Sequence, residues 1–120
     1  MEDFKFDFEK LSVYQKSLDF IDDIFALYRN LDRDYRQSIG NNLIRAAMSI
    51  ANNLAEGNDE KSKREKRRFF TYSSDSAREC VSVLNVLKRQ KILHNPMYST
   101  YRINAREITS MIRGLIESNE

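Results

Sequence analysis

A dense run of cations carries the clearest chemistry in this sequence. Six positive charges fall within eight residues, at Lys61, Lys63, Arg64, Lys66, Arg67 and Arg68. If the run is helical, Lys63 and Arg67 point away from the core, and so does Phe70. Cations bind phosphate groups whatever the base sequence, and an exposed aromatic ring can stack on a base. The run predicts a surface that binds RNA or DNA; a solvated helix face, or one that docks a protein, is the alternative.

Polar residues also follow one edge of the segment before this run. Arg45, Ser49, Asn52 and Glu56 share that edge if the segment is helical, and Asn53 lies nearer the core. A buried hydroxyl or amide without a hydrogen-bond partner costs ~1–3 kcal/mol. We therefore expect a structural network joining this segment to the start of the next one, at Arg45, Ser49, Asn53, Glu56, Ser62, Glu65 and Arg68. The alternative is that the amides line a site where two subunits meet.

The sequence offers no residues that could perform catalysis or hold a metal ion or a cofactor. Its one histidine, His94, stands alone at a predicted helix end, whereas di-iron sites in helix bundles pair Glu-x-x-His motifs on facing helices. Cys80 falls on a predicted core stripe, where a thiol is inert. The 3 glycines are too far apart to form a phosphate-binding loop. We expect no enzyme activity, no metal and no cofactor.

The elements that position these residues are all predicted to be helices. The chain of 120 residues has only 3 Gly and 1 Pro, and its apolar residues recur every three or four positions. This spacing predicts helices over residues 9–31, 35–56 and 63–91, and a fourth helix that starts at Pro96. Short turns between helices of this length predict one all-α domain over residues 1–120, an antiparallel up-down-up-down four-helix bundle.

Three of the helix ends carry sequence signals. Gly57 is expected to end the second helix as its C′ residue. Ser62 and Glu65 have the spacing of a capping box, in which each side chain bonds the backbone of the other residue. Asn95 is expected to cap the fourth helix, with Pro96 in its first position.

The second predicted helix is apolar on two sides. One side is its core face, and the other consists of Ile44, Met48, Ala51 and Ala55. In so short a chain, we expect this second side to pack against another subunit; packing against another helix of the same domain is the alternative. Residues 1–8 alternate apolar and polar, which indicates an extended arm. Its Phe4, Phe6 and Phe8 are expected to cap the domain's own core or to reach a neighbouring subunit.

The charge of the chain is divided unevenly. Residues 1–60 carry 7 Lys and Arg against 12 Asp and Glu, a net charge of −5, whereas residues 61–120 carry 13 against 6, a net charge of +7. Such polarity can steer partners or orient subunits. The single cysteine fits a reducing compartment, and the acidic N-terminus lacks the apolar core of a signal peptide. Because no apolar run approaches the ~20 residues that cross a bilayer, we expect a cytoplasmic protein without membrane contact.

Several motifs are distinctive together. They are L-S-V-Y-Q-K-S at residues 11–17, R-A-A-x-S-I-x-x-N-L-A-E-G at residues 45–57, S-x-x-E-x-x-R-F at residues 62–69, and Ser76 with Glu79. At this spacing they resemble the bacterial four-helix-bundle family named for the 23S ribosomal RNA intervening-sequence protein. The chain departs from the family at Ile44, where arginine is frequent, so one charge is missing from the second helix.

The resemblance implies a four-helix bundle that assembles into a ring, a homopentamer, and that has no catalytic activity. Related accessory proteins of diversity-generating retroelements are similar pentamers, whose basic surfaces engage nucleic acid and a reverse transcriptase. The sequence and the resemblance together predict a non-enzymatic oligomer that binds nucleic acid, RNA rather than DNA, through the start of its third helix. The alternative is a ring-shaped scaffold that docks a protein partner and has no nucleic-acid role.

Overall fold

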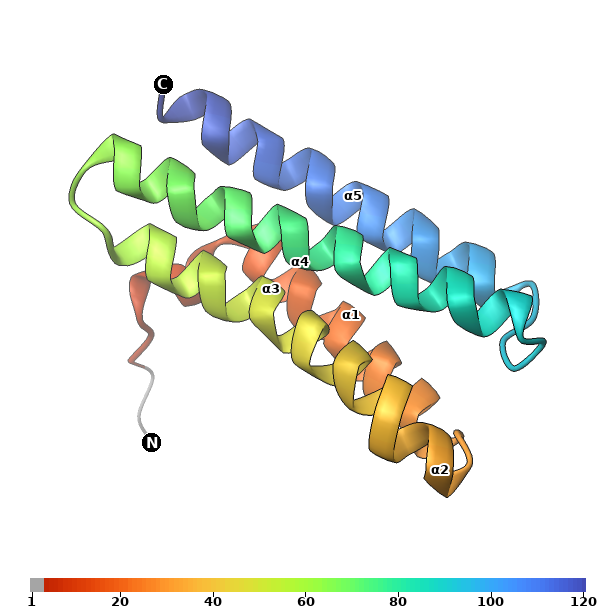
Figure 1. The fold of residues 1–120 in the computed structure, drawn as a ribbon. Helices are drawn as coiled ribbons and strands as arrows, with labels where there is room; N and C mark the ends of the chain where they lie inside the picture. The colour runs from red at the N-terminus through yellow and green to blue at the C-terminus, as the bar shows by residue number, and fades with distance from the viewer. Residues whose placement is uncertain (1–3) are drawn as a thin grey trace.

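The computed structural model of the protein describes residues 4–120, which form a bundle of four long helices (Figure 1). The long helices are α1 (Ser12–Arg29), α3 (Asn41–Asp59), α4 (Lys63–Arg89) and α5 (Met97–Ser118). A 3₁₀ turn, η1 (Asp7–Lys10), precedes α1, and a short helix, α2 (Arg33–Tyr35), leads through a π-helical turn, η2 (Arg36–Gly40), into α3. Each long helix runs antiparallel to the next, and α5 packs back against α1. The predicted up-down-up-down bundle is confirmed.

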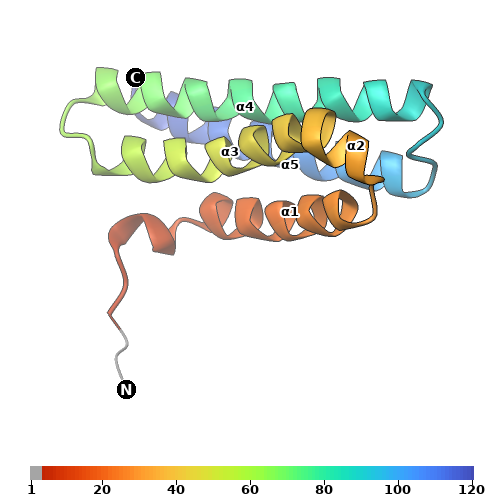
Figure 2. The ribbon, with the colours of Figure 1, turned by 60° about the horizontal axis from the view of Figure 1, so that its bottom comes forward.

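Apolar stripes from all four long helices meet in one core. Figure 2 shows α4 and α1 on opposite sides of the bundle, with α3 between them. The largest side chains that are fully buried are Phe20, Ile24, Leu43, Ile50, Leu54, Phe70, Leu84, Leu87, Ile108 and Ile112. Burying one such side chain contributes about 1.5–3 kcal/mol, so this core is the main source of stability. The core also holds α4 and α5 side by side, so that residues of both helices share one face of the molecule.

The serine cap of α4 is confirmed, but only half of the capping box forms. The backbone N–H of Glu65 donates to Ser62 Oγ at 3.1 Å. The Glu65 carboxylate does not return to the Ser62 backbone, because it accepts a hydrogen bond from Arg68 Nη1 at 2.6 Å. At the next helix, Pro96 is the N-cap residue and α5 begins at Met97. Asn95 Oδ1 accepts from the Ser99 hydroxyl at 3.1 Å.

Gly57 does not end α3, so its predicted role as a C′ residue is wrong. The helix continues to Asp59, and no glycine in residues 4–120 has a positive φ. Gly57 is buried instead, and a Cβ atom there would lie 2.8 Å from Cε1 of Phe70. The missing side chain therefore lets the ring of Phe70 pack directly against the α3 backbone.

The N-terminal arm predicted over residues 1–8 lies partly outside the described residues. The described part stays extended only as far as Phe6, and η1 then packs against α3. The ring of Phe8 makes an edge-to-face contact with Tyr14 at a centroid distance of 5.0 Å. Phe4 and Phe6 remain 69% and 59% exposed, so within this chain only Phe8 covers the domain's own core.

Candidate nucleic-acid interface

The structure separates the cationic run at the start of α4 into two groups. Lys61, Lys63 and Arg64 are exposed, and their side chains form no ion pair or hydrogen bond with any residue that the structure describes. We call these three residues the basic end. Because no internal contact has to be broken, their charges are available to an external anion.

Lys66 and Arg67 are engaged within the chain. Lys66 Nζ donates to the carbonyl of Asn58 at 2.8 Å, and Arg67 Nη1 donates to the carbonyl of Asn119 at 2.6 Å. Both acceptors belong to the C-terminal turns of helices, where carbonyls lack helical partners and the helix dipole is negative. The prediction that Arg67 points away from the bundle is therefore wrong, because the side chain crosses to the end of α5.

Arg68 is exposed but already paired. Its Nη1 donates to Glu65, and its Nε donates to the Tyr72 hydroxyl at 3.0 Å. The guanidinium also lies 5.5 Å from the ring centroids of Phe69 and Tyr72. The hydrogen bond to Tyr72 raises the pKa of Arg68 above its usual value. The hydrogen bond to Glu65 and the negative charge of Glu65 act in the same direction. Arg68 thus keeps its charge, but two of its nitrogen atoms already donate hydrogen bonds within the chain, so it has fewer N–H groups free for a phosphate.

Phe70 does not point outward, so it cannot stack on a base. Its side chain is only 2% exposed and packs against Gly57. The core face of α4 is rotated toward Phe70, Ser73, Ala77 and Cys80, all of which are buried. The exposed aromatic ring of this segment is Tyr72, at 42%.

The polar residues of α3 reach the middle of α4 and not its start. Arg45 Nη2 pairs with Glu79 at 3.2 Å. The Ser49 hydroxyl accepts hydrogen bonds from Ser76 Oγ and from Asn53 Nδ2, both at 2.9 Å. Because α3 and α4 are antiparallel, the first half of α3 lies beside the second half of α4.

The expected network is therefore smaller and differently connected. Ser62, Glu65 and Arg68 form a separate local cluster on α4. Glu56 belongs to neither group, since it is exposed and bonds none of residues 4–120. A further buried bond, from Ser73 Oγ to the carbonyl of Ile50 at 2.7 Å, ties α4 to α3. These bonds have a structural role and engage the amide of Asn53, whereas the exposed Asn52 bonds none of residues 4–120 and lines two surface hollows.

The second apolar side of α3 is partly covered by its own chain. Ala51 is buried, with 4% exposure, and Ala55 is half-buried beneath the arm that carries Phe8. Met48 is 44% exposed and Ile44 is half-buried, and both border a shallow hollow of about 470 Å³ on the surface. The part of this stripe that remains open to another subunit is thus Ile44 with Met48.

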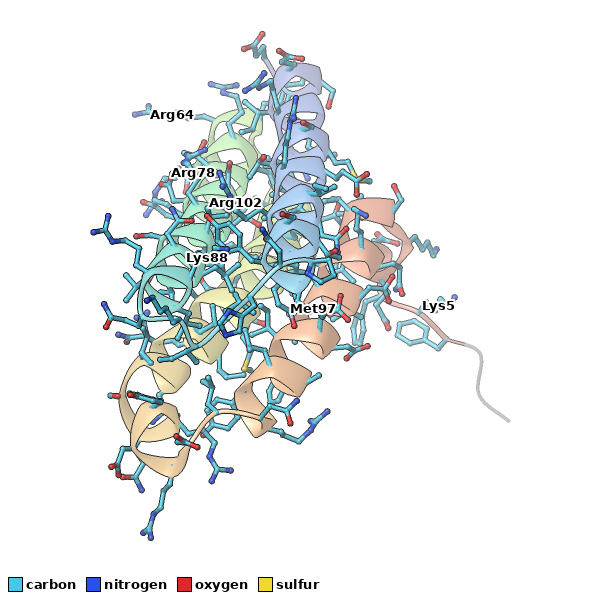
Figure 3. All side chains as sticks on the ribbon, turned by 90° about the vertical axis from the view of Figure 1, so that its right-hand side faces the viewer. Lys5, Arg64, Arg78, Lys88, Met97 and Arg102 are labelled. Carbon is cyan, nitrogen blue, oxygen red and sulfur yellow. The ribbon has the colours of Figure 1, made fainter. Side chains whose placement is uncertain are left out.

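A groove between α4 and α5 holds cations that the sequence reasoning missed. Its volume is about 710 Å³, and its lining includes Arg78, Arg102 and Arg106. Figure 3 shows Arg64, Arg78, Arg102 and Lys88 along this one face of α4 and α5. Two features of the sequence are consistent with such a surface. They are the net charge of +7 in residues 61–120 and the spacing of Arg102, Arg106 and Arg113 by four and seven residues. Neither signal showed which faces of the two helices would meet.

Other kinds of site receive no support from the described residues. In residues 4–120, His, Cys, Asp and Glu side chains nowhere gather in a group of three that could hold a metal ion. His94 is exposed, and Cys80 is fully buried. None of the helices in this part of the chain is long and apolar enough to cross a membrane.

Comparison with known proteins places this fold among its relatives. The sequence model of a family described as 23S rRNA-intervening sequence protein matches residues 9–114. A crystal structure from Bacteroides thetaiotaomicron, of a protein with unknown function from the S23 ribosomal protein family, superposes with a TM-score of 0.81. The two are 23% identical over 88% of this chain and 95% of that one, which is a likeness of fold. No curated protein matches the chain.

Proposed function

The chain belongs to the 23S rRNA-intervening sequence protein family, and we propose that it is a non-enzymatic, oligomeric helical bundle that binds nucleic acid. The observation that carries this proposal is the basic end, three exposed cations whose side chains have no partner among the described residues. The preference for RNA over DNA rests on the family name, which refers to ribosomal RNA. The geometry of the basic end suits the phosphate groups of either.

The basic end supports binding because its cations can release counterions from a nucleic acid at no internal cost. Each phosphate that a cation neutralises makes the affinity fall more steeply with salt. For a single strand, the slope of log affinity against log salt concentration changes by about 0.7 per contact. Lys66 and Arg67 would first have to leave the carbonyls that they now bond. We therefore narrow the expected phosphate contacts at this end of the bundle to Lys61, Lys63 and Arg64.

Replacing Lys63 and Arg64 with glutamine is expected to weaken binding of a fluorescent 20-nucleotide RNA about tenfold in 100 mM salt. The plot of log affinity against log salt should also become shallower, by about 1.4, because two phosphate contacts are lost. Fluorescence anisotropy between 50 and 200 mM salt measures both quantities. The matched control replaces Arg29 and Arg33, two exposed cations at the other end of the bundle, with glutamine. If the unaltered protein shows no binding in 50 mM salt, the proposal is wrong.

Assembly into a ring of identical subunits, expected to be a homopentamer, is supported by the exposed Met48 and the half-buried Ile44 beside it. We expect light scattering to give about five times the chain mass of 14.2 kDa. Met48→Lys should lower that mass, because it places a charge on the proposed contact. Val86→Lys is the control, since Val86 is exposed to the same degree, 45% against 44%, but lies on α4. A monomeric mass for the unaltered protein would rule the ring out.

A second candidate function is a protein-docking scaffold with no nucleic-acid role. The observation that favours it is the exposed arm, where Phe6 is 59% exposed and its ring lies 5.1 Å from the ring of Phe4, which is 69% exposed. A protein partner that stays bound after nuclease treatment, and that is lost on Phe6→Ser, would support this alternative. Co-purification of RNA that nuclease removes would count against it.

A further inference from the structure

We infer that the groove between α4 and α5 holds a single strand of nucleic acid, with phosphates on its arginines and base faces on its apolar floor. This inference rests on the proposed function and adds the form of the ligand and its path over the surface. The basic end would then be where the strand enters, and the groove would be where it is held.

The charged side chains that line the groove are all arginines, and the other polar side chains there are neutral. A second hollow of about 220 Å³ continues it, and the two share Arg78 and Thr109. The polar side chains that line the two hollows are Thr71, Ser74, Arg78, Ser82, Asn85, Ser99, Arg102, Arg106, Thr109 and Arg113. No Asp or Glu lines either hollow, although such residues make up 18 of the 120. Arg102, Arg106 and Arg113 form no ion pair with residues 4–120, and these three charges favour an anionic ligand.

The arginines on α5 keep most of their donors free. Arg106 and Arg113 have no side-chain partner among residues 4–120. Arg102 donates one bond, from Nη1 to the Tyr98 hydroxyl at 3.1 Å, and lies 5.4 Å from that ring. Spaced by four and seven residues, the three lie on one side of α5 over about 17 Å. They can therefore contact successive phosphates of a strand that runs along the helix.

Arg78, on the α4 side, is held in a set position. Its Nη2 pairs with Asp75 at 2.6 Å, and its Nη1 donates to Ser74 Oγ at 3.2 Å. Arg78 lines both hollows. A cation fixed in this way loses less conformational entropy on binding than a free side chain.

The floor of the groove explains why the ligand is a single strand. Its apolar surface comes from Ile103, which is 58% exposed, and from the half-buried Val81, whereas Ala77 and Ala105 line the groove but are buried. A double helix presents sugars and phosphates to a surface and keeps its base faces stacked inside. A single strand exposes those faces, which pack on apolar and aromatic side chains. An apolar floor between arginines thus contributes to binding only when the bases are unpaired.

The groove also continues the basic end. Arg64 lies on the same face of the molecule as Arg78, Arg102 and Lys88 (Figure 3). An acidic peptide could satisfy the arginines of the groove as well. The hydroxyl groups of Thr71 and Ser74, together with Arg64 and Lys88 beyond the hollows, favour a phosphate backbone that follows the whole face.

The test replaces Arg102 and Arg106 with glutamine in the full chain and compares three probes. These are a 20-nucleotide oligouridine, a 20-base-pair RNA duplex and a poly-glutamate peptide, each measured by fluorescence anisotropy in 100 mM salt. We expect the unaltered protein to bind the oligouridine at least fivefold more tightly than the duplex. The double variant should bind the oligouridine about tenfold more weakly, with a salt slope shallower by about 1.4, and should bind the duplex within twofold of the unaltered protein.

Ile103→Ser is a second variant that changes no charge and tests the apolar floor. It should weaken the oligouridine and leave the duplex within twofold. If both groove variants bind the oligouridine like the Arg29 and Arg33 control, while the variant at Lys63 and Arg64 loses it, the inference fails and the proposed function stands. If the unaltered protein binds neither RNA, both fail. Poly-glutamate that binds more tightly than oligouridine, and is lost with Arg102 and Arg106, overturns the inference in favour of a peptide groove.

Discussion

The Cys80 thiol is expected to react with a chromogenic disulfide reagent at pH 8 about 1000-fold more slowly in the folded protein than in the unfolded chain. Its side chain is 0% exposed, and burial, followed by the nearby Glu79 carboxylate, raises the pKa of Cys80 from 9.0 to about 12. The thiolate is the reactive form, and a pKa higher by three lowers its population about 1000-fold at this pH. Rates in buffer and in 6 M guanidinium measure the ratio. Similar rates would contradict the burial of Cys80.

The same pKa predicts how stability depends on pH. The unfolded chain loses the Cys80 proton near pH 9, whereas the folded chain keeps it up to about pH 12. The free energy of unfolding should therefore be constant below pH 8 as far as Cys80 is concerned, and should fall as pH rises above 9, by at most ~1.4 kcal/mol per pH unit. Cys80→Ala removes this component while other groups titrate unchanged. Urea unfolding from pH 7 to 10.5 should therefore show a shallower decline in the variant.

Gly57→Ala is expected to lower the free energy of unfolding by about 1–3 kcal/mol, the usual cost of overpacking a core. The added Cβ would lie 2.8 Å and 2.9 Å from two ring atoms of Phe70 and 3.0 Å from Cβ of Phe69. Phe70 is 2% exposed, so its ring has little room to move. Helix propensity by itself favours alanine by about 1 kcal/mol. We expect the clash to outweigh that gain.

Gly114→Ala is the matched control for this prediction. Gly114 is also helical, but it is exposed, and nothing lies within 4 Å of a Cβ built there. Alanine at this position should stabilise the protein by about 0.5–1 kcal/mol, because only the propensity term remains. Urea unfolding of both variants separates the two effects. If Gly57→Ala is as stable as the unaltered protein, the contact between α3 and Phe70 is looser than the structure indicates.

The all-α architecture followed from local patterns along the chain. Helix formation depends on residues three and four positions apart, so the spacing of apolar residues was enough to place the long helices. The cap at Ser62 is equally local, since its partner Glu65 lies three residues away. Family motifs in residues 11–79 also needed only the order of residues. These features are readable because the interactions that produce them act between near neighbours.

The face that each helix buries was harder to read. Adjacent residues on a helix differ by about 100° around its axis. A rotation of α4 by less than this angle therefore decides whether Phe69 or Phe70 points into the core. The actual rotation depends on Gly57, Ser73 and Ser76, whose small size lets α3 and α4 approach. The glycine could be recognised as a packing residue only once its neighbour across the turn was known.

The contacts that shape the candidate site join residues far apart in the chain. Arg67 bonds Asn119 across 52 positions, and Arg45 bonds Glu79 across 34. The groove between α4 and α5 exists only because the two helices lie side by side, which brings Arg78 to the same hollow as Arg106. Sequence patterns showed that the second half of the chain is basic. Tertiary packing decides which of these cations bond other residues of the chain and which remain free to bind a partner. A cation is available to a partner only where the fold places no acceptor beside it.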